Sequence, residues 1–358
     1  MTVTGIAAPG AGLSYPFAAP AADGSAVEVA PGLLWLRMPM PMALDHINVY
    51  LLQADEGWFI VDTGLDTPTT REIWRAVIAR LPGPVAGVVC THFHYDHAGL
   101  AAWLSETHDV PLWMTHGEYY MLRATAAPLP DPLPPLQQRH YDRSGMPPER
   151  QRAMLAALRR DGYSPAVPQA FRRLRDGDVL QIGARRWRIV VGEGHSPEHA
   201  CLYADADRIL LAGDQLLPRI SSNVLVMPIE PDADPLSLWL ASLRRLEALA
   251  PDTLVLPSHD EVFSGLHART RALDEHHREK LARLQSIVAE AGSCRAFEAM
   301  LALFPRLKGP VDDVLALGET LAHLAWLVRR GLLRCDGGAG VGAGGVQRYS
   351  RVPMEQVV

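Results

Sequence analysis

The stretch Thr91–Leu100 reads THFHYDHAGL and places His92, His94, Asp96 and His97 within six consecutive positions. The apolar run PVAGVVC precedes it directly, and a short run of this kind is typical of a buried strand. In α/β domains, functional side chains gather at the carboxyl ends of strands. The sequence therefore predicts a buried strand that delivers four titratable side chains to one loop.

The residue types and their spacing in this loop favour a metal site. His92 and His94 are two positions apart and can point to the same side of a loop, and Asp96 and His97 follow where we expect a helix to begin. A metal site needs neutral imidazoles and carboxylates that converge on one point. A solvated loop that happens to be rich in histidine is the alternative, and four such groups so close together weigh against it.

The segment resembles the H-x-H-x-D-H signature of the metallo-β-lactamase superfamily, and further motifs of that family occur in the same order along the chain. They are IVDTGL with Asp62, GHSPEH with His195, LLAGDQ with Asp214 and LVLPSHD with His259. The ordered set covers about residues 45 to 260. The resemblance implies an α/β fold, the αββα sandwich of that superfamily.

The resemblance also implies two divalent metal ions held by seven side chains: three on the first ion, three on the second, and one aspartate that bridges them. The resemblance assigns to the first ion His92, His94 and His195, and to the second ion Asp96, His97 and His259. The bridging aspartate is Asp214. Zinc fits these ligands, with iron and manganese as alternatives that ligand type does not separate. The implied reaction is hydrolysis by a hydroxide shared between the two metals, with Asp96 as a ligand that also receives or relays a proton.

Other residues are candidates for supporting roles. Asp62 either accepts a hydrogen bond from a liganding histidine and fixes its tautomer, or forms the turn in DTG. We expect His199 to be structural, at a helix start after Pro197. Five further side chains are candidates for the substrate pocket, with packing as the alternative: Tyr95, His46, Asn48, Tyr119 and Tyr120.

Composition and periodicity divide the chain into three parts. Residues 1–25 are rich in Ala, Pro and Gly and predict a flexible arm. Residues 26–265 alternate strand and helix signals, as in a catalytic α/β domain; INVYLL and GWFIVD predict a hairpin around DEG, and REIWRAVIARL predicts a helix. Residues 266–358 read as helices followed by a Gly-rich hairpin, which suggests a winged-helix-like domain.

Within the catalytic domain, residues 118–168 form an insertion with a proline cluster and a helical run. We expect it to be an apolar lid over the metal cleft, and the alternative is that its apolar side chains only pack it onto the domain.

The overall composition excludes some partners and compartments. The net charge is −6 and no dense stripe of Lys and Arg occurs, so neither nucleic acid nor a membrane is a favoured partner. The four cysteines show no C-x-x-C spacing and no export signal is visible, which predicts a cytoplasmic protein. The apolar C-terminal helices could pack on their own domain or on a second copy in a homodimer.

These observations favour a metal-dependent hydrolase of a carboxylic thioester, ester or lactone, because an apolar lid suits a small acyl substrate. The metal motifs look like those of hydroxyacylglutathione hydrolases, although the insertion and the C-terminal region differ. A metal-dependent endoribonuclease or phosphodiesterase is the alternative, since a winged-helix-like tail resembles the β-lactamase-like endoribonucleases. A β-lactamase is a further alternative that the lack of an export signal disfavours.

Overall fold

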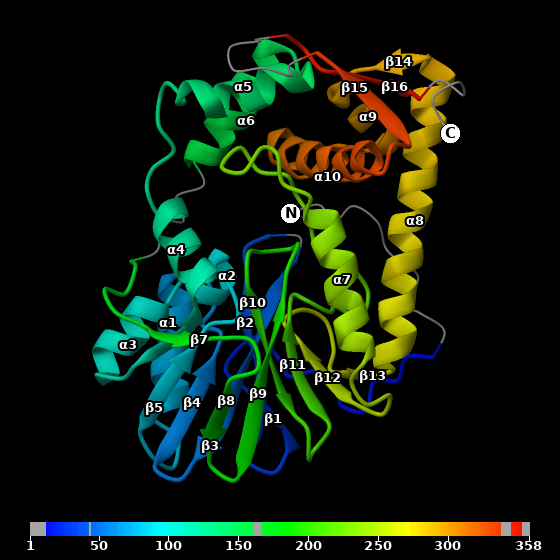
Figure 1. Ribbon diagram of the computed structural model, residues 1–358. Coiled ribbons are helices and arrows are strands. Elements are labelled where there is room, and N and C mark those ends of the chain that lie inside the picture. The colour runs from blue at the N-terminus through cyan, green and yellow to red at the C-terminus, as the bar shows by residue number, and fades with distance from the viewer. Residues whose placement is uncertain (1–11, 43, 161–165, 338–344, 353–358) are drawn as a thin grey trace.

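Two β-sheets packed face to face, with helices on both outer faces, make up the catalytic part of the molecule (Figure 1). The computed structural model describes residues 12–42, 44–160, 166–337 and 345–352 of the chain. The outer helices of the sandwich are α1 (Pro68–Ile78), α3 (Ala101–His108), α7 (Pro235–Glu247) and α8 (Leu266–Ala291). The predicted αββα sandwich is confirmed.

The first sheet has seven strands, which follow one another in space in the order of the sequence. They are β1 (Ala26–Ala30), β2 (Leu33–Pro39), β3 (His46–Ala54), β4 (Gly57–Val61), β5 (Val85–Val89), β6 (Leu112–Thr115) and β7 (Arg172–Leu174). The predicted hairpin is the antiparallel pair β3–β4. From β4 onward the strands are parallel, so the loops that follow β4, β5 and β6 leave the sheet at the same edge.

The second sheet has six strands in the order β13-β12-β11-β10-β9-β8. They are β8 (Val179–Ile182), β9 (Arg185–Gly192), β10 (His199–Ala204), β11 (Ile209–Gly213), β12 (Leu254–Pro257) and β13 (Phe263–Ser264). Strand β10 is antiparallel to β9 and to β11, whereas β11 and β12 are parallel. Strands β9, β11 and β12 therefore run in one direction, and their carboxyl ends lie at one edge.

Strand β3 shows how the layers are built. Successive side chains of a strand point to opposite faces: Val49 and Leu51 join Trp74 of α1 in one apolar cluster, whereas Tyr50 and Leu52 join the cluster between the sheets. Because both faces are covered, the strand is a nearly continuous apolar run rather than an alternating one.

Helix α1 was predicted over residues 71–81 and spans Pro68–Ile78. It begins earlier because the Thr67 side chain accepts a hydrogen bond from the Thr70 backbone N–H and caps the helix, and Pro68 occupies the first turn, where no backbone donor is needed.

The C-terminal part has the order of elements of a winged-helix unit. Helix α8 is followed by β14 (Ser293–Cys294), α9 (Ala296–Leu303), α10 (Pro310–Arg329), β15 (Leu333–Asp336) and β16 (Arg348–Arg351). The three strands form an antiparallel sheet in the order β14-β16-β15. The Gly-rich residues 338–344, expected at the hairpin tip, lie outside the described residues.

The insertion joins the catalytic and C-terminal parts. Its first helix, α4 (His116–Thr125), packs on β6, whereas α6 (Pro148–Arg160) lies beside α10. Helix α5 (Pro135–Ser144) precedes α6 in the same part of the molecule (Figure 1). Arg150 of α6 pairs with Asp313 of α10 through two hydrogen bonds of 2.6 and 2.7 Å. Met154 and Leu155, expected in a lid, are buried in the cluster that contains the C-terminal helices. The apolar side chains therefore attach the insertion to the C-terminal part.

The predicted N-terminal arm is only partly described. From residue 12 on it lies against the domain: Ser14 pairs with Ser264 through two backbone hydrogen bonds, and Leu13 and Tyr15 pack on the core. Among the helices of the described ranges, none combines the length and the apolar character that crossing a bilayer requires.

Candidate metal centre

The seven predicted ligands follow four strand ends, which the two sheets bring to one edge of the sandwich. His92 and His94 follow β5, and Asp96 and His97 lie in the short helix α2 (Tyr95–Ala98) of the same loop. From the second sheet, the ligands follow β9, β11 and β12, in the order His195, Asp214 and His259. This placement matches the rule that functional groups gather at carboxyl ends of strands.

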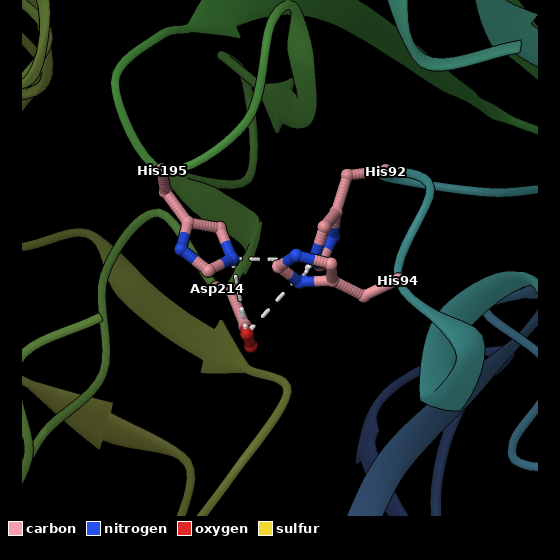
Figure 2. A group of neighbouring side chains, drawn as sticks. All are labelled: His92, His94, His195 and Asp214. Carbon is pink, nitrogen blue, oxygen red and sulfur yellow. Dashed lines mark hydrogen bonds and ion pairs between the residues drawn. The ribbon is translucent and has the colours of Figure 1, made fainter. Parts of the chain in front are cut away.

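The first group consists of His92, His94, His195 and Asp214, whose side chains point toward one another (Figure 2). His92 Nε2 lies 2.8 Å from His94 Nδ1 and 3.3 Å from His195 Nε2. Asp214 Oδ2 lies 3.4 Å from His195 Nε2 and 3.9 Å from His92 Nε2. Two donors bound to one tetrahedral ion at about 2.0–2.1 Å are about 3.3 Å apart, so these separations suit a shared ion.

The second group consists of Asp96, His97 and His259. Asp96 Oδ2 lies 3.6 Å from His97 Nε2 and 3.5 Å from His259 Nε2. Asp214 Oδ1 lies 3.6 and 3.4 Å from the same two nitrogens. The two oxygens of Asp214 therefore face different groups, which is the arrangement of a bridging carboxylate.

Two buried atoms test whether these residues fit a metal. Among the described residues, His97 Nε2 and Asp214 Oδ1 have no hydrogen-bond partner, and their separation of 3.6 Å is longer than a hydrogen bond. An unsatisfied buried polar atom costs about 1–3 kcal/mol. A divalent cation between them would accept an electron pair from each, so the donor set fits such an ion.

The protonation of the histidines follows from burial and from the nearby carboxylates. Burial, aided by the neighbouring imidazoles, holds the pKa of His92 well below its ordinary value, and burial lowers the pKa of His94 to about 3. Neutral imidazole is the form that binds metal. Burial acts in the same direction on His97, but the surrounding carboxylates, led by Asp96, outweigh it and raise its pKa well above the ordinary value. In the absence of an ion, a proton on His97 supplies the positive charge that these carboxylates attract.

Both ligating carboxylates remain ionised at neutral pH. Burial alone would raise the pKa of Asp214, but the positive charges of His259 and His97 outweigh it and hold the pKa well below its usual range. For Asp96 burial again acts upward, and His97 and His259 together lower the pKa to about 2.

The Asp62 carboxylate orients His97, a member of the second group, through a hydrogen bond. Its Oδ2 accepts hydrogen bonds of 2.8 Å from His97 Nδ1 and from Thr91 Oγ1, and its Oδ1 accepts one of 2.8 Å from the Thr91 backbone N–H. With Nδ1 as the donor, His97 presents Nε2 to the cluster. Asp62 also has a positive φ of 59°, so the two alternatives for this residue, orienting a histidine and forming a turn, both describe it.

His46 and Asn48, predicted as candidates for the pocket, hold the loop that carries His259. The His46 carbonyl accepts a 2.9 Å hydrogen bond from His259 Nδ1, and His46 Nε2 accepts one of 3.2 Å from the Asp260 backbone N–H. Asn48 is fully buried and donates to the carbonyls of Pro257 and Asp260. Both residues therefore position a ligand.

His199 begins strand β10, so the expected helix start is wrong. The residues around it pair with β9 and extend the second sheet. Its Nε2 accepts a 3.1 Å hydrogen bond from the Asp214 backbone N–H, and its ring stacks on His92 with centroids 4.8 Å apart. It therefore supports one ligand from each sheet, which agrees with the predicted structural role.

The tyrosines predicted for the pocket make packing contacts. Tyr119 is buried, stacks on Phe171 and donates a 2.8 Å hydrogen bond to the Pro168 carbonyl. Tyr120 is 53% exposed on the outer surface of α4. The Tyr95 hydroxyl donates to the Thr125 carbonyl at the end of α4. These contacts match the packing alternative for the insertion.

Glu118 of α4 is a buried residue of the site that the sequence analysis missed. Its Oε2 accepts a 3.0 Å hydrogen bond from the Phe93 backbone N–H, and its Oε1 accepts bonds of 2.6 Å from Ser196 Oγ and 2.7 Å from the Glu198 backbone N–H. Burial raises its pKa to about 7, against the effect of these three donors. One carboxylate thus ties the His92–His94 loop to the His195 loop.

Comparisons with known proteins agree with this geometry. The chain matches the family described as the Metallo-beta-lactamase superfamily over residues 42–259, and the family described as Metallo-beta-lactamase-like, C-terminal domain, over residues 281–352. The crystal structure of a beta-lactamase domain protein from Burkholderia ambifaria is 43% identical, with a TM-score of 0.85, over 95% of this chain and 98% of that one.

The curated relatives that are named as enzymes include two that are similar over most of the chain. The probable metallo-hydrolase YqjP of Bacillus subtilis is 29% identical over 81% of this chain and 90% of its own length. The acyl-coenzyme A thioesterase MBLAC2 of Gallus gallus is 25% identical over 74% of this chain and 86% of its own length.

Proposed function

Because the chain belongs to the metallo-beta-lactamase superfamily and is a metallo-hydrolase, we propose that it hydrolyses a small carboxylic thioester, with esters and lactones as related substrates. One observation carries the proposal: the two oxygens of Asp214 face two separate groups of donors. One of these groups contains His97 Nε2, which lacks a hydrogen-bond partner in the described ranges. This arrangement suits two cations side by side, and carboxylic-acid derivatives are substrates whose carbonyl oxygen such a pair polarises.

The ligand types favour zinc, with iron and manganese as alternatives. His92, His94 and His195 would hold one ion, Asp96, His97 and His259 the other, and Asp214 both. Bound divalent cations supply two things to hydrolysis: they make water a nucleophile near neutral pH, and they polarise the carbonyl oxygen.

The residues of the chain supply orientation and a place for the proton. Asp62 and the His46 carbonyl fix the imidazoles of His97 and His259 through their Nδ1 atoms. The Asp96 side chain is 13% exposed, so water that enters the site can reach its carboxylate oxygens. We assign it the proton transfer that the sequence analysis expected.

The choice of a thioester is supported by MBLAC2, a relative named as an acyl-coenzyme A thioesterase that is similar over most of both chains. A metal-dependent endoribonuclease is the second candidate, and the observation in its favour is the winged-helix order of the C-terminal elements. The net charge of −6 weighs against it.

A substrate panel tests the proposal. The purified protein, supplied with zinc, iron or manganese in turn, is assayed with acyl thioesters, aryl esters, lactones, a chromogenic cephalosporin and single-stranded RNA. We expect thioester hydrolysis that is lost in His94→Ala and kept in His108→Ala, a control on α3 outside the cluster. RNA cleavage without acyl hydrolysis would reverse the ranking, and cephalosporin hydrolysis alone would favour the β-lactamase.

A further inference from the structure

A cavity of about 700 Å³ lies between the insertion and the C-terminal domain. One wall is α5, the opposite wall is α10, and the remaining lining comes from β15, β16 and the segment 226–233 that follows the metal loop. Ligand pockets in proteins occupy about 300–1,000 Å³. The proposed function assigns no role to this cavity.

Three guanidinium groups line the cavity: Arg139 and Arg143 of α5, one turn apart, and Arg329 of α10. Arg139 donates to the Pro135 carbonyl. Arg329 donates to the backbone carbonyl of Asp232, and its Nε lies 4.0 Å from Oδ2 of Asp234, just outside the cavity lining. The Nε of Arg143 is buried and has no hydrogen-bond partner among the described residues.

The other ionisable side chains of the lining leave this positive charge in excess. The Asp232 carboxylate is an exposed group at the edge, and burial, followed by the charge of Arg143, lowers the pKa of His140 to about 4, so His140 is neutral. In a chain with a net charge of −6, such a concentration of guanidinium groups favours an anion.

The same cavity has an apolar side. Leu321, Ala325 and Val328 follow one another on one face of α10, and Val226 lies against them. Leu136, at the cavity edge on α5, is 70% exposed. A ligand that fills this space would therefore combine anionic groups with an apolar body.

The segment after Asp214 connects the cavity to the metal cluster. The Asn223 carbonyl accepts a 2.8 Å hydrogen bond from His195 Nδ1, and the Val226 backbone N–H donates a 3.1 Å bond to Gly318 of α10. Three residues of extended chain span at most about 11 Å. Val226, in the wall of the cavity, therefore lies within about 11 Å of Asn223, whose carbonyl orients the predicted ligand His195.

We propose that this cavity binds the phosphate-bearing carrier of an acyl thioester, as found in acyl-coenzyme A, while the thioester carbonyl lies at the metal cluster. The inference rests on the proposed function, because it names the substrate class of the same site. Guanidinium groups bind phosphate oxygens in pairs of parallel hydrogen bonds. The apolar face of α10 packs against the base of the carrier.

The kinetic test compares two substrates that share the acyl group and the thioester bond. One is an acyl-coenzyme A, and the other is the N-acetylcysteamine thioester, which lacks phosphate. In Arg143→Gln and in the Arg139→Gln/Arg143→Gln variant, we expect the ratio of kcat/KM for acyl-coenzyme A to that for the truncated substrate to fall about tenfold or more, as for the loss of a charge-assisted hydrogen bond. Arg208→Gln, at the β10–β11 turn and paired with Asp252, is the matched control. An unchanged ratio overturns the proposal and leaves thioester hydrolysis standing.

A binding test separates failure of this inference from failure of the proposed function. Calorimetric titration with free coenzyme A needs no turnover, and we expect binding to the wild-type protein that is weakened about tenfold in Arg143→Gln and unchanged in Arg208→Gln. Such a result supports binding of coenzyme A in the cavity even if no thioester is cleaved. Equal binding by both variants, or displacement of coenzyme A by single-stranded RNA at lower concentration than by inorganic pyrophosphate, overturns it.

Discussion

Among the residues that the structure describes, histidines and carboxylates gather in two clusters, and only one of the two has the features of a metal site. The second joins His277 of α8 to Glu319 and His323 of α10, all buried, with ligand-type atoms within 4.8 Å of one another. Each cluster has a buried atom without a hydrogen-bond partner in the described part of the chain, Asp214 Oδ1 in the metal cluster and His277 Nε2 in the second, but the carboxylates differ. In the second cluster Glu319 forms an ion pair with Lys280, so its carboxylate already has a cation.

The histidines of the two clusters also differ. His323 Nδ1 donates to the Glu319 carbonyl, and its Nε2 lies 3.2 Å from His277 Nδ1, which can donate to it. Burial lowers the pKa of His277 and His323 and keeps both neutral, whereas carboxylates raise the pKa of His97. Proximity of ligand types is therefore not sufficient: a metal site also has carboxylates whose neighbours are histidines rather than a lysine, and nitrogens directed at a common point.

The largest expected effect is that of Asp214→Asn. The substitution keeps the shape of the side chain but removes the charge that both groups share. We expect loss of metal from both groups and a fall in kcat/KM of more than about 10³-fold, since even residues that only orient a ligand are worth about 10–100-fold. Metal content and turnover measure it, with Glu319→Gln as the matched change in the second cluster. Full turnover in Asp214→Asn would remove the distinction between the clusters.

Lys280→Met tests the second cluster by its stability. The change removes the ammonium group that pairs with the buried Glu319 carboxylate, and breaking a buried ion pair costs about 3–5 kcal/mol. We expect the free energy of unfolding in urea to fall by this amount, with much of the loss recovered in Lys280→Met/Glu319→Gln. A gain of a third metal ion in Lys280→Met would instead show that the lysine stands where a cation binds.

Asp62→Asn tests orientation within the metal cluster. Asn tolerates the positive φ of this position, so the change removes an acceptor of the His97 and Thr91 hydrogen bonds with little effect on the backbone. We expect metal affinity to fall about 10–100-fold, as measured by competition with a chelator. An unchanged affinity would leave Asp62 with only its turn-forming role.

Glu118→Gln has the smallest expected effect. The amide keeps one acceptor oxygen and turns its NH₂ toward a backbone donor at Phe93 or Glu198, which costs about 1–3 kcal/mol. We expect a corresponding loss in the free energy of unfolding and weaker metal binding by the group that contains His92, His94 and His195. Glu106→Gln, on the exposed side of α3, is the control, and equal effects of the two substitutions would contradict the role of Glu118.

The sandwich and a shared site for the seven ligands could both be predicted from the sequence, because the sequence signals for them are local. Each ligand follows an apolar strand in a short motif, and strand ends converge at one edge. The β3–β4 hairpin is equally local, with its turn residues between two apolar runs.

The features that the sequence did not predict depend on distant contacts. Glu118 is one acidic residue in a helix, and its partners at Phe93 and Ser196 are brought to it only by the fold. The insertion has apolar side chains whether it covers the metal residues or packs on α10, so its sequence does not distinguish the two. His199 follows a proline and reads as a helix start, but pairing with β9 makes it the beginning of a strand.

Metal content, measured by mass spectrometry of metals on purified protein, tests the central claim most directly. The proteins to compare are the wild type, Asp214→Asn and His277→Gln/His323→Gln, each supplied with excess divalent metal and then desalted. We expect two ions per chain in the wild type and in the His277/His323 variant, and fewer than one in Asp214→Asn. Two ions retained in Asp214→Asn, or ions lost from the His277/His323 variant while it remains folded, would contradict the central claim.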